Sequence, residues 1–162
     1  MGLRFSILAS GSTGNAMVVE NEEIKLLIDA GLSAKKIEQL LEARDTSAKE
    51  LKGILITHEH ADHIKGVGAL ARRYNLPIYA NEKTWGELQR QIGEIAEEKK
   101  IVMNTGEMID FGSIKVESYG ISHDAVEPVG YCFYDGQEKL SLATDLGYVS
   151  EKVQEKLVDS DV

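Results

Sequence analysis

The stretch His58-Glu59-His60-Ala61-Asp62-His63 is the part of this sequence that decides which fold and which chemistry to expect. It holds three of the four histidines of the chain, packed around an aspartate. Imidazole nitrogens and carboxylate oxygens are the usual ligands of a catalytic transition metal. A polar loop that is rich in histidine by chance would not concentrate them in this way, so the stretch predicts a metal site.

The residues on either side place this stretch at the end of a strand. Gly53 to Thr57 is a short apolar run typical of a buried strand, and Ile64 to Tyr74 has the spacing of a helix. The carboxyl ends of strands are where α/β sheets place their active sites. The metal ligands are therefore expected at the edge of a sheet.

Alternation of side chains along an extended segment divides the ligands between two ions. His58 and His60 are two residues apart, so they point the same way and can bind one metal, whereas Glu59 points to the opposite face. Asp62 and His63 follow the turn, point elsewhere and can bind a second metal.

The rest of the chain interleaves strand and helix signals. We expect strands over residues 3–9, 16–20, 24–28, 77–80, 101–103, 107–110, 113–118, 130–134 and 140–144, and helices over 33–44, 83–91 and around Val153 and Leu157. Ser33 is the expected N-cap of the first helix, and Asp135-Gly136 is a strong hairpin turn signal. This alternation predicts a layered α/β fold in one domain.

Composition limits the partners and the compartment. With 43% hydrophobic and 28% charged residues the chain is ordinary for a globular protein. Its net charge of −9 argues against non-specific nucleic-acid binding by this part alone, because such binding needs dense Lys and Arg contacts to phosphate. The single cysteine, Cys132, excludes an internal disulfide. No apolar run approaches the roughly 20 residues of a membrane span, and the N-terminus lacks the charged region and cleavage site of a secretory signal, so we expect the cytoplasm.

Four motifs, in the order in which they occur, resemble those of the metallo-β-lactamase superfamily. The stretch at 58–63 matches its signature His-x-His-x-Asp-His. The other three strings are Leu26-Leu27-Ile28-Asp29-Ala30-Gly31, Ser122-His123-Asp124 and Ala143-Thr144-Asp145-Leu146-Gly147. The resemblance covers essentially the whole chain. It implies the four-layer αββα sandwich, of which this chain would hold the first sheet and part of the second.

The resemblance also implies how the ligands are shared. It implies that the first metal is bound by His58, His60 and His123, that the second is bound by Asp62 and His63, and that Asp145 bridges them, with Asp62 and Asp145 as catalytic residues. Asp145 on its own would be equally compatible with turn chemistry. Asp29 is expected either to orient the His58 segment by hydrogen bonds or to cap a strand end. For Asp124, a supporting contact and plain exposure stay open.

Longer strings are similar to the YycJ (WalJ) group within the superfamily. They are Leu8 to Asn15, Asn81-Glu82-Lys83-Thr84-Trp85 and His123 to Tyr131. This group is associated with 5′-to-3′ exonuclease activity on DNA. The resemblance therefore implies a metal-dependent phosphodiesterase whose substrate is DNA.

One superfamily motif is missing from the sequence. The fifth motif is a histidine that completes the second metal site, and the chain ends at Val162 with every histidine already assigned. We therefore expect residues 1–162 to be one metallo-β-lactamase-like domain truncated at its C-terminus, with an incomplete second site and impaired activity. The sheet that loses its partner strands is expected to be covered by a complementing C-terminal fragment or by self-association.

The expected metals define the reaction type better than the substrate. Two divalent ions roughly 3.5–4 Å apart would hold a water that loses its proton, and the resulting metal-bound hydroxide would attack an electrophilic centre. Three imidazoles with carboxylates suit Mn²⁺, Zn²⁺ or Fe. Beside the DNA exonuclease, two alternatives stay open: a hydrolase of small thioesters or lactones, and an inactive metal-binding module. A flavin-linked di-iron domain is disfavoured, because that group replaces some of these histidines with carboxylates.

Overall fold

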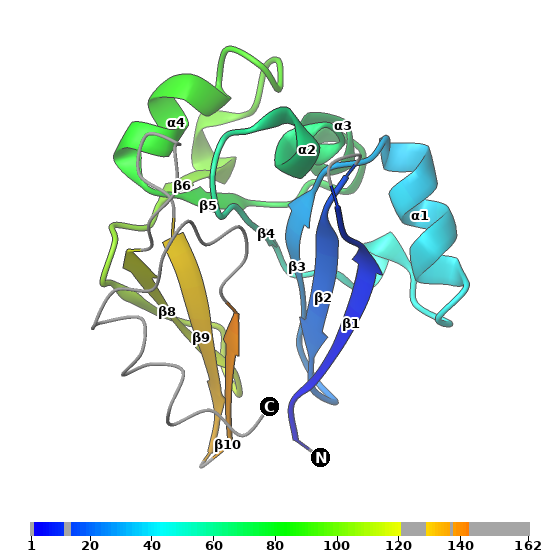
Figure 1. The fold of residues 1–162 in the computed structure, drawn as a ribbon, viewed down its shortest axis with the longest axis vertical. Coiled ribbons are helices and arrows are strands. Elements are labelled where there is room, and N and C mark those ends of the chain that lie inside the picture. The colour runs from blue at the N-terminus through cyan, green and yellow to red at the C-terminus, as the bar shows by residue number, and fades with distance from the viewer. Residues whose placement is uncertain (1, 12–13, 121–128, 137, 143–162) are drawn as a thin grey trace.

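Two sheets face each other in the computed structural model, which describes residues 2–11, 14–120, 129–136 and 138–142 (Figure 1). The first sheet has six strands in the order β1-β2-β3-β4-β5-β6. They are β1 (Arg4–Ala9), β2 (Ala16–Glu20), β3 (Lys25–Ala30), β4 (Ile54–Leu55), β5 (Ile78–Ala80) and β6 (Lys100–Val102). The β1-β2-β3 part is antiparallel and the β3-β4-β5-β6 part is parallel, so the last four strands end at the same edge.

The second sheet has four antiparallel strands in the order β10-β9-β8-β7. They are β7 (Met108–Asp110), β8 (Lys115–Gly120), β9 (Val129–Asp135) and β10 (Glu138–Leu142). The hairpin predicted around Asp135-Gly136 is confirmed, because Glu138 pairs with Asp135 across that turn. Gly136 takes a φ of 62°, which glycine adopts without strain.

Four helices and two 3₁₀ turns connect the parallel strands. They are α1 (Ala34–Glu42), η1 (Ala48–Glu50), α2 (Ala61–Ile64), α3 (Val67–Tyr74), α4 (Glu82–Leu88) and η2 (Glu97–Lys99). The predicted N-cap is confirmed, since the Ser33 hydroxyl accepts a hydrogen bond from the amide of Lys36. None of the described helices is long and apolar enough to cross a membrane.

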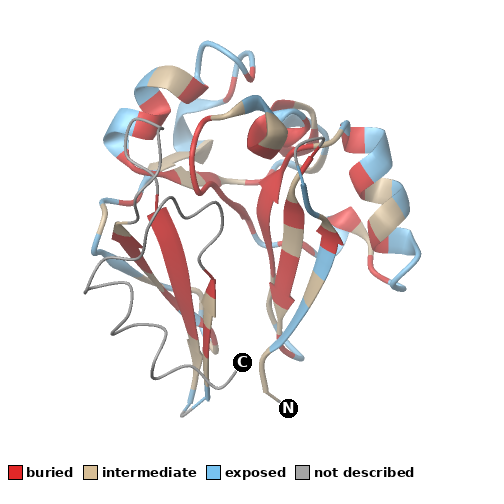
Figure 2. Cartoon of the chain, viewed as in Figure 1, coloured by how far each residue is buried: buried red, intermediate tan, exposed pale blue. Residues whose placement is uncertain are grey.

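Two apolar clusters hold these layers together. Figure 2 shows that most of β3 and β9 is buried. The outer cluster joins the helices to the first sheet through residues such as Ile37, Leu70 and Leu88. The inner cluster lies between the sheets and includes Ile28 and Phe133. Strand alternation produces this division, because Leu27 belongs to the outer cluster and its neighbour Ile28 to the inner one. The expected layered α/β fold with two facing sheets is confirmed.

The helix predicted from Ile64 to Tyr74 is wrong in its start and its continuity. The chain becomes helical already at Ala61 and breaks between α2 and α3. The amide of Gly66 would close an intrahelical bond to Asp62, but it donates to the carbonyl of Ala30 at 2.7 Å instead. A Cβ on Gly66 would lie 2.3 Å from the carbonyl oxygen of Leu32, so this close approach requires glycine. The last helix expected near Val153 lies outside the described residues.

Candidate metal centre

Three histidine rings meet at the carboxyl end of β4. The ring centroids of His58 and His60 are 4.8 Å apart, and those of His58 and His63 are 3.9 Å apart. His58 and His63 are completely buried, whereas His60 is partly exposed. His60 has extended backbone angles and is the N-cap residue of α2, so the helix begins directly after it.

Asp62 lies beside this ring cluster, in the first turn of α2. Its Oδ2 is 3.7 Å from Nε2 of His63, and its side chain is 30% exposed. Two donor atoms arranged tetrahedrally around one ion, at ordinary bond lengths, are roughly 3.4 Å apart. The spacing of Asp62 and His63 therefore suits a pair of ligands on a single divalent cation that solvent can reach.

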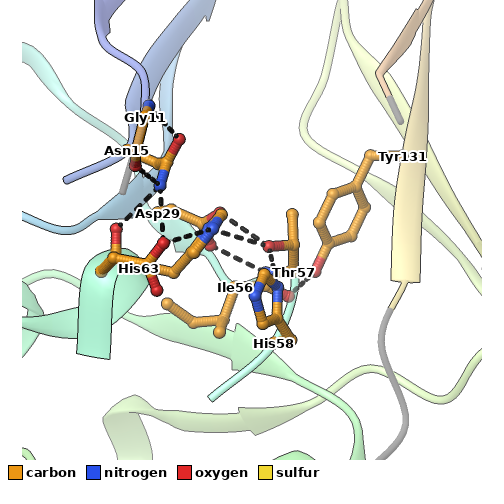
Figure 3. Close-up of polar contacts among 9 residues, drawn as sticks. Gly11, Asn15, Asp29, Ile56, Thr57, His58, His63 and Tyr131 are labelled. Carbon is orange, nitrogen blue, oxygen red and sulfur yellow. Dashed lines mark hydrogen bonds and ion pairs between the residues drawn. The ribbon is translucent and has the colours of Figure 1, made fainter. Parts of the chain in front are cut away.

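Asp29, at the end of β3, is the hub of the hydrogen bonds beneath the rings (Figure 3). Its Oδ1 accepts from the amide of Thr57 at 2.8 Å, and its Oδ2 accepts from the Thr57 hydroxyl at 2.7 Å. The same Oδ2 lies 2.5 Å from Nδ1 of His63. Of the two roles expected for Asp29, the geometry corresponds to orientation of the histidine segment.

These bonds determine which ring nitrogens can face a metal. The Thr57 hydroxyl donates its one proton to Asp29, so toward Nδ1 of His58, 2.9 Å away, it acts as an acceptor. His58 and His63 then both carry their proton on Nδ1, and Nε2 is the atom with a lone pair for a cation. A carboxylate behind a metal-binding histidine is a common device for fixing the tautomer.

A β-bulge directs the side chain of Asp29 toward Thr57 and His63. The β2–β3 ladder pairs Ala16 with Ala30 and Met17 with Ile28, so Asp29 is the extra residue. Its φ is 62°, in the left-handed region that costs most L-residues about 1–2 kcal/mol. Bulges often redirect a side chain beside an active site, and Asp is among the residues that tolerate this conformation.

The second sheet supports the strand end through Tyr131, which the sequence did not single out. Its hydroxyl donates to the carbonyl of Ile56 at 2.5 Å. Burial raises the pKa of Tyr131 well above its ordinary value, and the nearby Asp29 carboxylate raises it further. Tyr131 is therefore a protonated donor at all physiological pH values, and it ties β9 to the residues that precede the histidine motif.

His123, Asp124 and Asp145 lie outside the described residues, but their described neighbours reach the site. Gly120 pairs with Val129 across the range 121–128, and the amide of Val129 donates to the carbonyl of Thr57 at 2.9 Å. Leu142, which precedes the range 143–162, lines a cavity of about 100 Å³ together with Asp29 and His63.

The described side chains fit a divalent metal in chemistry but form no complete shell. Within residues 2–11, 14–120, 129–136 and 138–142, no three His, Cys, Asp or Glu side chains already have the spacing of a full metal site. Imidazole nitrogens with fixed tautomers and an adjacent carboxylate are nevertheless the donor set of Zn²⁺ and related ions.

Sequence comparison identifies the family. Residues 9–161 match the family model described as the metallo-beta-lactamase superfamily. This match covers nearly the whole chain, so the chain belongs to that superfamily, a family of metal-dependent hydrolases that typically bind divalent metals.

Two relatives show which members it is similar to. The chain is 53% identical over 154 residues to the exodeoxyribonuclease YycJ of Bacillus anthracis, covering 95% of this chain and 58% of the relative. It is 47% identical over 155 residues to the exodeoxyribonuclease WalJ of Streptococcus pneumoniae strain D39, covering 94% and 58%. The chain therefore spans 58% of the length of both relatives.

Solved structures agree on the fold. A Cronobacter sakazakii metallo-beta-lactamase with a HARLDQ motif superposes with a TM-score of 0.72 at 13% identity, over 94% of this chain and 65% of that protein. At this identity the likeness concerns the fold alone.

Proposed function

We propose that the protein is a metal-dependent phosphodiesterase that degrades DNA from the 5′ end. The observation that carries the hydrolase is the convergence of His58, His60 and His63 beside Asp62 at the carboxyl end of β4. The choice of DNA rests on the relatives, because both are named exodeoxyribonucleases. The proposed compartment is the cytoplasm, where bacterial DNA lies.

The proposed metal ligands fall into two sets. His58 and His60, with His123, would hold one divalent ion, and Asp62 and His63 would hold another, with Asp145 between them. When bound, such ions make a coordinated water acidic and neutralise charge on phosphate oxygens.

The residues beneath the metal-binding side chains would hold those side chains in a fixed orientation. Asp29 and Thr57 hold Nδ1 of both buried histidines, so the rings cannot rotate away. Tyr131 anchors the carbonyl of Ile56 and keeps the strand end in place. The partly exposed His60 and Asp62 form the side from which a nucleic-acid end would enter.

The test is hydrolysis by the full-length protein of duplex DNA labelled at the 5′ or the 3′ end, with Mn²⁺ or Zn²⁺, beside a chromogenic thioester. We expect early release of the 5′ label and no thioester cleavage. Asp62→Ala should lower the rate by about 100-fold or more, because it removes a metal ligand. Asp110→Ala, at the exposed last position of β7, is the matched control and should keep full activity.

Other outcomes would favour the alternatives. Thioester cleavage without DNA cleavage would replace the nuclease by a small-molecule hydrolase. Tight metal binding without any hydrolysis would indicate an inactive metal-binding module.

A further inference from the structure

We infer that Asn15 is a positioning residue that holds the carboxylate of Asp62 in its metal-binding orientation. Asn15 belongs to the segment between β1 and β2, 47 residues away from Asp62 in the sequence. The inference rests on the proposed function in one respect, namely that Asp62 and His63 bind a divalent cation together.

The amide group of Asn15 uses both of its N–H bonds in a defined way (Figure 3). Its Nδ2 donates to the carbonyl of Gly11 at 2.8 Å, and to Asp62 at Oδ2 (3.0 Å) and at the main-chain oxygen (3.2 Å). Its Oδ1 accepts from the amide of Gly11 at 3.1 Å. Gly11 thereby fixes which end of the amide faces Asp62, and the end that faces it is the donor.

The main chain of Asn15 also forms a hydrogen bond with Asp62. Its amide donates to the carbonyl of Asp62 at 2.8 Å, and its carbonyl accepts from Gly31 at 2.9 Å. In a longer helix, the carbonyl of Asp62 would accept from Gly66, but that amide is bonded to Ala30. Asn15 therefore supplies the partner that the four-residue helix α2 lacks.

These contacts bear on the metal because α2 on its own would hold Asp62 loosely. The helix is one turn long, and the Asp62 side chain is 30% exposed, so solvent competes for its oxygens. The bond from Asn15 keeps Oδ2 at 3.7 Å from Nε2 of His63, the spacing that suits two ligands of one ion. A neutral amide does this without a positive charge that would repel the cation. Partners of this kind are typically worth about 10–100-fold in metal affinity.

The experiment is a calorimetric titration of the metal-free, full-length protein with Mn²⁺, which separates two binding equivalents. Asn15→Ala should weaken the equivalent bound by Asp62 and His63 about 10–100-fold and leave the other one unchanged. Asn15→Leu, which keeps the side-chain volume and the main-chain bonds, should show the same loss if the alanine variant folds poorly.

Asn21→Ala is the matched control. Asn21 also joins distant segments, because its Nδ2 donates to Ser113 at 2.8 Å and to Asp135 at 3.0 Å, but these lie in hairpin turns outside the histidine cluster. If Asn15 has only a structural role, Asn15→Ala and Asn21→Ala should both lower the melting temperature, and both should bind Mn²⁺ like the wild type.

Double substitution shows whether Asn15 acts through Asp62. In an Asp62→Ala background, Asn15→Ala should cause no further loss of Mn²⁺ affinity. The inference is overturned if Asn15→Ala binds both equivalents like the wild type, or if its effect adds fully to that of Asp62→Ala. If Asp62→Ala itself binds both equivalents normally, the ligand assignment in the proposed function fails instead.

Discussion

At the scale of single residues, Asp29, Thr57 and Tyr131 hold the histidine segment at the carboxyl end of β4. The clustering of His58, His60 and His63 is visible as a string, because one extended segment and one turn bring the rings together. Thr57, Tyr131 and Asn15 could not be predicted in the same way. Their contacts depend on a β-bulge, on the approach of the second sheet and on a broken helix, and no local pattern encodes these.

Asp29→Asn is the sharpest test of the hydrogen-bond hub. Asn fits the left-handed backbone of position 29 and keeps the shape, but one of its ends is a donor and would face Nδ1–H of His63 or the amide of Thr57. We expect Zn²⁺ affinity to fall about 10–100-fold with the fold retained, as measured by metal titration and circular dichroism. Asp110→Asn is the isosteric control. Wild-type affinity in Asp29→Asn would mean that Asp29 does not set the ring tautomers.

At the scale of elements, the order of strands and helices followed from hydrophobic periodicity and turn residues, and most of it is confirmed. The boundary that failed is the α2–α3 break. The break is caused by tertiary contacts. The amide of Gly66 donates to Ala30 at the end of β3, and the carbonyl of Asp62 accepts from Asn15, which precedes β2. A pattern of apolar residues cannot report such a competition for backbone hydrogen bonds. Asp62 and His63 lie on the separate short helix α2, where the ring centroid of His63 is 3.9 Å from that of His58.

The close packing of these segments predicts opposite effects at two glycines. A Cβ at Gly31 would lie 1.8 Å from the carbonyl oxygen of Asp62, whereas one at Gly86 in α4 would meet nothing within 4 Å. In urea unfolding, Gly31→Ala should lose about 1–3 kcal/mol or more, since backbone must move. Gly86→Ala should gain about 0.5–1 kcal/mol from helix propensity. Equal stability of the two variants would contradict the close approach of β3 and α2.

At the scale of the whole molecule, the inner face of the first sheet is only partly covered by the second. Ile7, on the edge strand β1, is 53% exposed, and Phe5 is 41% exposed. Their ladder partners Met17 and Val19 belong to the inner cluster, so both side chains point between the sheets. The expectation that a further fragment or a second copy covers this face stays a prediction. The layered fold itself could be predicted, because strand alternation and the motif order depend on the sequence alone.

The most direct test of the central claim is an anomalous-difference map from crystals of the full-length protein soaked with Mn²⁺ or Zn²⁺. The claim is that the cluster at the carboxyl end of β4 holds the divalent metals of a hydrolase. We predict one peak within about 2.0–2.3 Å of ring nitrogens of His58 and His60, and a second at the same range from Asp62 and His63. Peaks elsewhere, or none at these residues in crystals of protein that still hydrolyses DNA, would contradict it.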